Sequence, residues 1–427
     1  MSMSENATAA TTAAGTVPPE RVEVPPHVPE ELVHWVDHHN DEIVHIDPIG
    51  FMDELREKYR VFYSPAYEGF WAVTRWEDQR EVFQRPEDFS SSPVGLPGGP
   101  GYGGVKMLPI ELDPPEHKKY RALINPVFGP KRIGAMEDHI RSTANALIDD
   151  ILENNGDKIE FMEAYAEQLP VRIFTEMLGL PFEEHKKFIG WVSAILHSSQ
   201  IGDGLVRKRE AGGEVTKYLT QLIGERAADI DSGVENDDLI TILLNSEVDG
   251  EKLTHDEVLR MSFLLFIAGL DTVTAAHGLM FRFLADNPEH RAQIVSDPEF
   301  IPNAIEELLR YNSFVNDART VTHDLEFAGV AMKKGDRVWL HSGSACRDPR
   351  EFDDPLIVDF LRRPNRHLAF AAGAHRCAGS NLARLELRIS FEEWHRRIPD
   401  YQVTPGTELR MHCGGVAGLE SLPLTLG

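Results

Sequence analysis

The chain has 427 residues, of which 42% are hydrophobic, so it has ample material for a buried core. Its 69 acidic and 43 basic residues give a formal net charge of −26, which disfavours binding to nucleic acid or to an anionic membrane. Its three cysteines are too few and too scattered for a disulfide framework, which predicts a reducing cytoplasm.

The N-terminal region carries no recognisable targeting signal. Residues 1–16 lack the basic start and the apolar run of a signal peptide. Residues 1–24 are polar, small and proline-bearing, and we expect a disordered arm there. The longest apolar stretch, around 263–270, is far shorter than a membrane span. These features predict a soluble, cytoplasmic protein.

The rest of the chain, residues 25–427, reads as one domain without an internal repeat or a linker. A short β-like run at 70–75 precedes a glycine- and proline-rich segment at 91–109, which is typical of a mobile lid loop. Apolar residues then recur at helical spacing from 115 to 312. Short strands follow at 318–342, then a small-residue loop and a helix that ends near 398. The predicted fold class is mainly α with small β-sheets.

The helix that ends near residue 285 has polar residues at its centre. THDE at 254–257 is a capping box, and the sequence after it is apolar on nearly all sides. Asp271 and Thr272 interrupt this apolar stretch, and a buried acid is costly without a purpose. Thr272 can donate a hydrogen bond to the carbonyl of residue 268, and Gly269 weakens the helix, so the helix could open locally. A plain core threonine is the alternative.

The loop 370–379 reads FAAGAHRCAG and sets Cys377 among alanines and glycines, just before a helix. A helix N-terminus favours thiolate over thiol. Four interpretations are open: a buried structural cysteine, half of a zinc site with His375, a nucleophile, or a thiolate ligand to a flat macrocycle. Only the macrocycle explains why the residues are small throughout, with one aromatic residue, Phe370, at the entrance.

The pattern F-x-x-G-x-H-x-C-x-G in this loop resembles the haem-ligand loop of the cytochrome P450 monooxygenases. The resemblance implies a P450 fold, haem b (iron protoporphyrin IX) as cofactor and Cys377 as its axial ligand. Chain order agrees, because AGLDTV (268–273) and EELLR (306–310) precede the loop as they do in that family. The resemblance assigns oxygen activation to Thr272 and proton relay to Asp271. Glu307 and Arg310 would anchor the segment beneath the haem.

The same resemblance identifies groups that would surround the haem. The stretch DPPEHKKYRALINPVFG (113–129) is similar to the family's propionate-binding helix. It implies that cations at four positions bind the propionates, while Phe370 contacts the ring. These cations are His117, Arg121, Arg319 and His375.

Several segments, including 113–129, AGLDTV and RRIPDY (396–401), resemble the bacterial camphor hydroxylases. Three departures stand out. Ala371 takes a position that is commonly glycine, and His197 replaces the arginine that supports the relay acid. The position of the carbonyl-binding tyrosine falls on Val105, with Tyr102 the nearest tyrosine. The resemblance places the substrate pocket at Val105, Met107, Leu264, Ala268, Val315 and Val416.

The expected function is therefore hydroxylation of a small apolar terpenoid or norisoprenoid with dioxygen. The sequence has no flavin or nicotinamide fingerprint, so electrons would come from an iron–sulfur ferredoxin and its reductase. From residue 360 to 385 there are five arginines and no acid, and we expect Lys118, Arg363 and Arg366 to form part of a ferredoxin-docking surface on a monomer. A peroxide-using peroxygenase of the same fold, a non-catalytic haem ligand-binding protein and a cysteine hydrolase are the alternatives.

Overall fold

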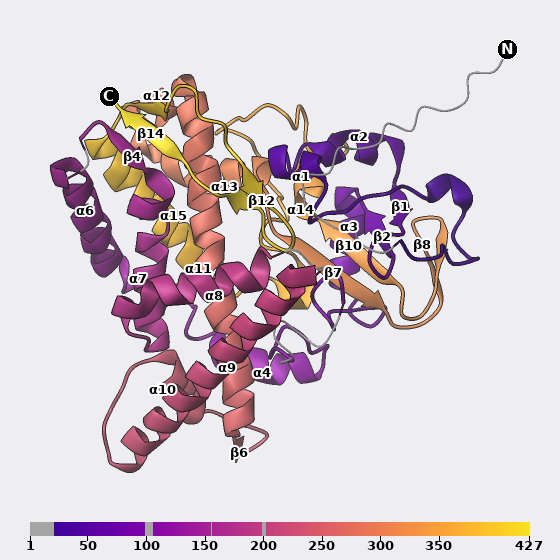
Figure 1. The fold of residues 1–427 in the computed structure, drawn as a ribbon, viewed down its shortest axis with the longest axis horizontal. Coiled ribbons are helices and arrows are strands. Elements are labelled where there is room, and N and C mark those ends of the chain that lie inside the picture. Colours follow the sequence, from indigo (N-terminus) through magenta and orange to yellow (C-terminus); the bar gives the residue numbers. More distant parts are fainter. Residues whose placement is uncertain (1–20, 99–105, 155, 199–201) are drawn as a thin grey trace.

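The computed structural model describes residues 21–98, 106–154, 156–198 and 202–427. Most of the predicted N-terminal arm and part of the predicted lid loop lie outside these ranges, as do Tyr102 and Val105. The described chain forms one helix-rich body with small sheets, which confirms the predicted fold class. Figure 1 shows most helices gathered on one side and the largest sheet on the other.

The helices vary from single turns to long rods. They are α1 (Glu42–Ile46), α2 (Phe51–Lys58), α3 (Trp76–Gln84), α4 (Glu116–Ile124), α5 (Pro130–Gly134), α6 (Glu137–Asn154), α7 (Gln168–Leu178), α8 (His185–Leu196), α9 (Gly202–Asp231), α10 (Leu239–Leu244), α11 (His255–Asp286), α12 (Pro288–Ser296), α13 (Ile301–Tyr311), α14 (Ser342–Cys346) and α15 (Ser380–Arg397).

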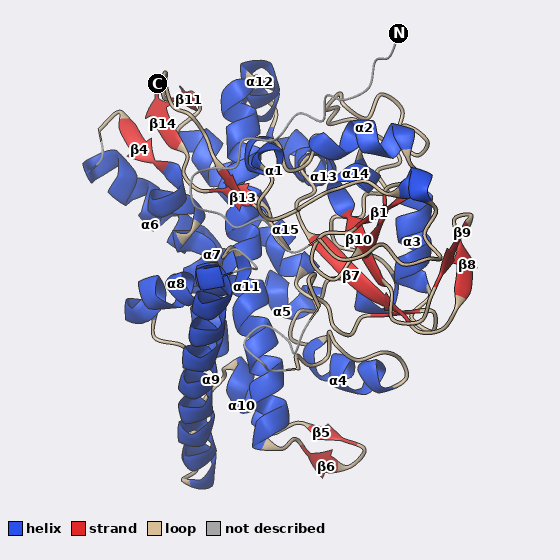
Figure 2. Cartoon of the chain, turned by 45° about the vertical axis from the view of Figure 1, so that its right-hand side comes forward, coloured by secondary structure: helices blue, strands red, loops and turns tan. Residues whose placement is uncertain are grey.

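The strands are short and lie in small sheets (Figure 2). A five-stranded sheet has the order β1-β2-β10-β7-β3, in which β10 pairs with β2 in parallel and the other pairs are antiparallel. A three-stranded sheet has the order β11-β14-β4, and three two-stranded hairpins complete the set. The strands are β1 (Val61–Ser64), β2 (Phe70–Val73), β3 (Phe89–Ser90), β4 (Lys158–Glu160), β5 (Glu247–Val248), β6 (Glu251–Lys252), β7 (Asn316–Val321), β8 (Leu325–Phe327), β9 (Val330–Met332), β10 (Arg337–His341), β11 (Tyr401–Val403), β12 (Met411–His412), β13 (Gly418–Leu419) and β14 (Pro423–Leu426).

Helix α11 runs through the helical side and forms the centre of its core (Figure 1). Its predicted capping box is confirmed: Thr254 Oγ1 accepts from the Glu257 amide at 3.2 Å, and the Glu257 carboxylate accepts from the Thr254 amide at 2.8 Å. Among the described residues, α11 is the one helix long and apolar enough to cross a membrane by length and composition. However, 61% of its most apolar window is buried inside this protein. Its apolar character is that of a core helix.

Two details of α11 differ from the sequence-based prediction. The helix is continuous from His255 to Asp286, so the local opening expected near Gly269 is absent. Gly269 instead permits close packing, because a Cβ there would lie 2.3 Å from the ring of Phe174 on α7. The back-bond from Thr272 Oγ1 to the Ala268 carbonyl does form, at 3.0 Å, without breaking the helix.

Candidate active site

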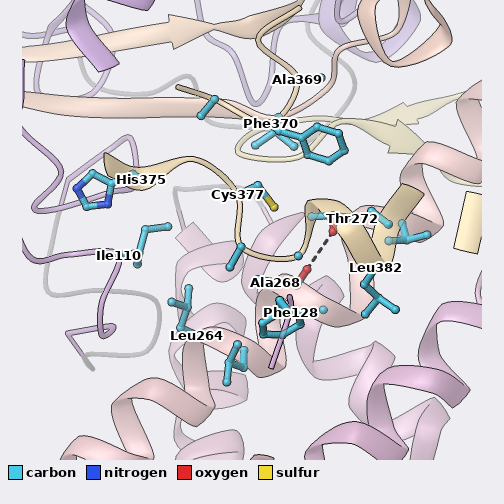
Figure 3. Close-up of a pocket in the computed structure, with 18 of the residues that line it drawn as sticks. Ile110, Phe128, Leu264, Ala268, Thr272, Ala369, Phe370, His375, Cys377 and Leu382 are labelled. Atoms are coloured by element: carbon cyan, nitrogen blue, oxygen red, sulfur yellow. Dashed lines mark hydrogen bonds between the residues drawn. The ribbon is translucent and has the colours of Figure 1, made fainter. Parts of the chain in front are cut away.

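An apolar cavity of about 280 Å³ lies between α11 and the loop that precedes α15. Ala268 is exposed although it sits in the middle of a core helix, because it faces this cavity. Leu264 and Thr272, one turn before and one turn after Ala268, line the same space. Figure 3 shows the sulfur of Cys377 facing this space from the loop. A thiol and a hydroxyl thus border one apolar chamber from two different elements.

The loop approaches its neighbours closely, as the run of small residues predicts. Gly373 has φ of +70°, and a Cβ there would lie 2.3 Å from the backbone oxygen of Phe83. The Cys377 amide donates to the Phe370 carbonyl at 3.0 Å and closes the loop. Ala371 has φ of +53°, a left-handed conformation that strains any residue except glycine. This explains physically why glycine suits position 371 better than alanine.

The state of the Cys377 thiol differs from the prediction based on the helix N-terminus. Burial raises the pKa of Cys377, and the opposing effects of the Gly379 backbone and of Arg121, Arg376 and Arg384 do not offset it. The helix end alone therefore does not produce a thiolate. Coordination of a metal ion deprotonates a thiol directly, so the loop suits a ligand that brings its own positive charge.

Three of the four predicted propionate ligands line the cavity, and the fourth, Arg319, is close enough to lower the pKa of His375. The three lining residues are His117, Arg121 and His375, and the rings of His117 and His375 lie 4.2 Å apart between centroids. Arg319 on β7 is 3% exposed and donates to the Ala318 carbonyl at 2.7 Å.

The electrostatics of this group indicate an anion site. Burial, Arg319, His117 and Arg121 lower the pKa of His375 to about 3, and burial and Arg121 lower that of His117 to about 4. Both ring nitrogens of His117 are buried and find no hydrogen-bond partner within the described part of the chain. The nearest carboxylate to Arg319 is Asp317, at 3.6 Å. Carboxylates of a bound ligand would relieve this repulsion and supply acceptors, so the residues present fit haem propionates.

Asp271 faces away from the cavity. Its Oδ2 lies 3.1 Å from Nε2 of His197, which follows the last residue of α8. Burial alone would raise the pKa of Asp271, but the charge and the hydrogen bond of His197, together with His412, bring it below the usual value. Asp271 and Thr272, which are about 100° apart around the helix, thus point to different sides, the acid away from the chamber and the hydroxyl toward it.

The predicted substrate pocket is placed only in part. Leu264, Ala268 and Val315 line the cavity. Met107 and Val416 are buried but are not among its described lining residues, although Val416 forms a β-bridge with Val315. Val105 lies outside the described residues.

The sequence analysis missed several cavity residues because they carry no motif. They are apolar side chains brought in by α4, α7 and α15 and by the segments between elements, and only the amphipathic pattern of those helices could have indicated them. The apolar ones include Ile110, Phe128, Phe174, Phe314 and Leu382. Glu386 on α15 also lines the cavity, and burial raises the pKa of its carboxyl to about 8.

Glu307 and Arg310 on α13 form a fully buried ion pair. Arg310 Nε and Nη2 each lie 2.8 Å from a different Glu307 oxygen, which is a bidentate arrangement. Arg310 Nη1 also donates to the carbonyls of Cys346 and Pro355 at 2.9 and 2.8 Å. Glu307 accepts from Arg362 Nε at 3.0 Å. The pair therefore ties α13 to the segment that leads into the Cys377 loop.

The arginines near the loop fall into two groups. Arg362 and Arg384 have internal carboxylate partners, Glu307 and Glu306 respectively. Arg363 and Arg366 are exposed, as is Lys118 on α4. Arg366 contacts Glu351 at 2.7 Å and, with Arg80 and Arg376, lines a hollow bordered by residues 371–373 of the loop. The sequence analysis did not include Arg80, because it lies almost 300 positions earlier in the chain.

Comparisons with known proteins agree with this site. Residues 42–394 match the family described as Cytochrome P450. The chain is 36% identical to the probable cytochrome P450 127A1 of Sinorhizobium fredii, covering 86% of both sequences. It is 32% identical to the methyl-branched lipid omega-hydroxylase of Mycobacterium tuberculosis, covering 88% of this chain and 90% of that protein.

Solved structures give the same result for the fold. The crystal structures of CYP101J2 and CYP101C1 superpose with TM-scores of 0.83 and 0.84, each at 29% identity over 95% of this chain and all of the other. Both belong to the camphor-hydroxylase branch that the sequence resembles. The protein therefore belongs to the cytochrome P450 family and is a haem-dependent monooxygenase.

Proposed function

We propose that this monooxygenase hydroxylates a small apolar substrate of terpenoid or norisoprenoid type, with dioxygen and with electrons from a ferredoxin and its reductase. The observation that carries the proposal is the shared apolar chamber between the Cys377 sulfur and the Thr272 hydroxyl. Haem, when bound, supplies the oxidising chemistry of the reaction. The chain would supply the iron ligand, the residues that bind the propionates, the apolar chamber for the substrate and a path for protons.

Each group has a role that follows from its place. Cys377 would hold the iron from the loop side. His117, Arg121, Arg319 and His375 would hold the propionates, because the two arginines bring positive charge and the two imidazoles can donate N–H hydrogen bonds to carboxylate oxygens. Phe370, which lies over the guanidinium of Arg384 at 4.4 Å, would pack against the ring edge.

Thr272 and Asp271 divide the proton chemistry between two sides of α11. The Thr272 hydroxyl borders the chamber, so it can hold a proton where oxygen chemistry takes place. Asp271 is on the outward side and can collect protons through its contact with His197. Glu307 and Arg310 would act only by positioning the loop, since neither lines the chamber.

The substrate class rests on what borders the chamber above the loop. Leu264, Ala268, Val315 and Phe174 offer apolar contact, and the described lining has few polar groups apart from the haem anchors. Among the relatives, one is named for a methyl-branched lipid. A 30% identical structure, CYP109E1 from Bacillus megaterium, was solved in complex with testosterone. Both compounds are largely apolar, which agrees with the proposed class.

A coupling experiment tests the function. With a ferredoxin, its reductase and a terpenoid that binds, the natural enzyme should convert consumed dioxygen mainly to product. Thr272→Ala should keep NADH consumption but divert it to hydrogen peroxide, because the hydroxyl that holds the proton is gone. Thr274→Ala on the same helix is the matched control, since Thr274 is buried and does not line the chamber. This variant should couple NADH consumption to product as well as the natural enzyme does. Full coupling in Thr272→Ala would contradict the assignment.

Peroxide-driven turnover as fast as the ferredoxin-driven reaction would favour a peroxygenase instead.

The electron donor is proposed to dock beside the Cys377 loop. Arg363, Arg366 and Lys118 are exposed basic groups on a chain of net charge −26, and local contrast of this kind orients an acidic partner. Arg363→Glu combined with Arg366→Glu should slow electron transfer from the ferredoxin without changing the spin shift caused by substrate. Arg282→Glu, an exposed reversal on α11, is the control. Equal rates in the double variant would place the partner elsewhere. The monomeric state and cytoplasmic location stay predictions.

A further inference from the structure

Three side chains with metal-binding atoms meet on the outer side of α11. His197 follows α8, Asp271 lies on α11 and His412 ends β12. One ligand atom from each lies within 4.8 Å of the other two. None of the three is among the described lining residues of the haem chamber, so this cluster is a separate site. We propose that His197, Asp271 and His412 bind a divalent transition-metal ion of the zinc type.

The donor set determines the class of ion. Two imidazoles and one carboxylate suit zinc and its neighbours in the first transition row, whereas magnesium and calcium prefer oxygen ligands throughout. Three protein ligands would leave a fourth position open for water. The arrangement brings together residues from three elements far apart in the sequence, which is why no spacing motif indicated it.

The geometry needs little adjustment. His197 Nε2 and Asp271 Oδ2 lie 3.1 Å apart, close to the separation of roughly 3.3 Å between two ligands at about 2.0–2.1 Å from one tetrahedral zinc ion. The ion would replace the proton that these two atoms now share. The ring of His412 stacks on that of His197 at 3.6 Å between centroids, tilted by 21°. The three ligand atoms lie within 4.8 Å of one another, so a side-chain rotation of His412 toward the other two would complete the set.

His412 supplies the independent sign of a missing ligand. Its Nε2 is buried and has no hydrogen-bond partner among the residues that the structure describes, an arrangement that costs free energy unless something binds there. Gly418 lies next to this nitrogen, and a Cβ at position 418 would lie only 2.7 Å from it. The nitrogen therefore needs glycine at 418 to keep its space. The side chains of His197 and Asp271 are 12% and 13% exposed, so these two ligands are already largely desolvated.

A consequence follows if Asp271 relays protons, and this step rests on the proposed function. An ion on the Asp271 carboxylate would occupy the group that collects protons for Thr272. Zinc should then slow turnover while substrate binding in the chamber stays unchanged. The metal site itself does not depend on that role.

Calorimetric titration of zinc into the haem-loaded enzyme, freed of other metal ions with a chelator, tests the site. We expect one zinc ion per chain at the tightest site and no comparable heat from magnesium. His412→Asn and Asp271→Asn should each weaken that site at least tenfold. The matched control is His139→Asn, which removes an exposed histidine that pairs with Glu176 at 2.6 Å but belongs to no three-ligand group of the described residues. Its zinc binding should stay natural.

The outcomes separate the two ideas. Absence of zinc binding, or equally tight binding in both His412→Asn and Asp271→Asn, would overturn the metal site. Zinc binding that these variants weaken, together with zinc-slowed turnover of the natural enzyme, supports the site and its consequence. The same binding with unchanged turnover would support the site and contradict the relay role of Asp271.

Discussion

Two groups of buried ionisable side chains lie close to the Cys377 loop, and they differ in whether the protein itself supplies their partners. Arg310 is fully buried, and Glu307 and backbone carbonyls complete its hydrogen bonds inside the protein. His117 and His375 are also enclosed, but Arg121 lowers the pKa of both and Arg319 that of His375, and no carboxylate of the described residues forms an ion pair with either ring. The hydrogen bonds of the first group are formed without any ligand. The second group gains its missing partners only when an anion binds.

This difference separates structural charges from binding charges better than burial does. Both groups are removed from water, and each buried charge needs a partner. Where the chain provides that partner, the charge stabilises the fold. Where it does not, the fold keeps an unfavourable arrangement that a ligand can relieve. Substitutions in the two groups should therefore affect different measured quantities.

The largest effect is expected from Arg310→Leu. It leaves the Glu307 carboxylate buried without its main partner, which typically costs about 3–5 kcal/mol of unfolding free energy. Urea unfolding of the holoprotein measures it. Arg282→Leu on α11 removes an exposed ion pair and should cost only about 0.3–0.5 kcal/mol. A loss of stability in Arg310→Leu as small as in the control would show that the pair is not a structural anchor.

Arg319→Gln should affect haem retention rather than folding. One charged hydrogen bond to a propionate contributes about 1.5–3 kcal/mol, so haem should leave roughly ten to a hundred times faster. Transfer of haem to an excess of apomyoglobin measures the rate. Arg337→Gln on the neighbouring β10 is the control, because Arg337 donates to the carbonyl of Pro93 at 2.9 Å and is not among the charges that lower the pKa of His375. If Arg319→Gln releases haem at the same rate as the natural protein, Arg319 does not bind a propionate.

Glu306 extends the first group to a titratable carboxylate. Burial alone would raise its pKa, but hydrogen bonds from Arg384 and His367 lower it to about 2. Glu306→Gln should therefore cost about 1.5–3 kcal/mol near neutral pH.

The pH dependence of that cost has a definite sign. Because the folded pKa of Glu306 lies below the ordinary value of 4.5, its contribution is complete above about pH 4.5 and is lost as the pH falls toward 2. Urea unfolding of natural and Glu306→Gln proteins should show a difference that shrinks by about 1.4 kcal/mol per pH unit below that point. A difference that is constant with pH would mean that Glu306 is not ionised in the folded protein.

The smallest effect concerns backbone strain in the loop. Ala371→Gly removes a left-handed alanine and should stabilise the holoprotein by about 1 kcal/mol. Ala372→Gly is the control, because Ala372 has φ of −139° and gains nothing from glycine. It should be neutral or should destabilise by about 0.5–1 kcal/mol. Thermal unfolding compares them, and a gain that is equal in both variants would rule out relief of strain at 371.

The loop, the core helix and the family were predictable because local chemistry indicates them. Small residues around Cys377, a capping box at Thr254 and an acid–hydroxyl pair in an apolar helix each depend on neighbours in sequence. The different directions of Asp271 and Thr272 also follow from helical geometry, because neighbouring residues are about 100° apart around a helix.

What the sequence could not provide was contact between distant segments. The stacking of His197 on His412, the role of Gly269 against Phe174 and the raised pKa of Cys377 all depend on tertiary packing. The ion pairs of Arg362 with Glu307 and of Arg384 with Glu306 also depend on tertiary packing. Because of them, fewer arginines are free on the basic surface than the five that the sequence contains there.

The central claim is that Cys377 binds haem iron through its sulfur, and the absorption spectrum of the reduced carbon-monoxide complex tests it most directly. The natural protein should show the strongly red-shifted Soret band of thiolate ligation. Cys377→His should still bind haem but should return the band to the ordinary haem position, whereas Cys413→Ser, a control at another buried cysteine, should leave it shifted. An unshifted band in the natural protein, or a shifted band in Cys377→His, would contradict the account.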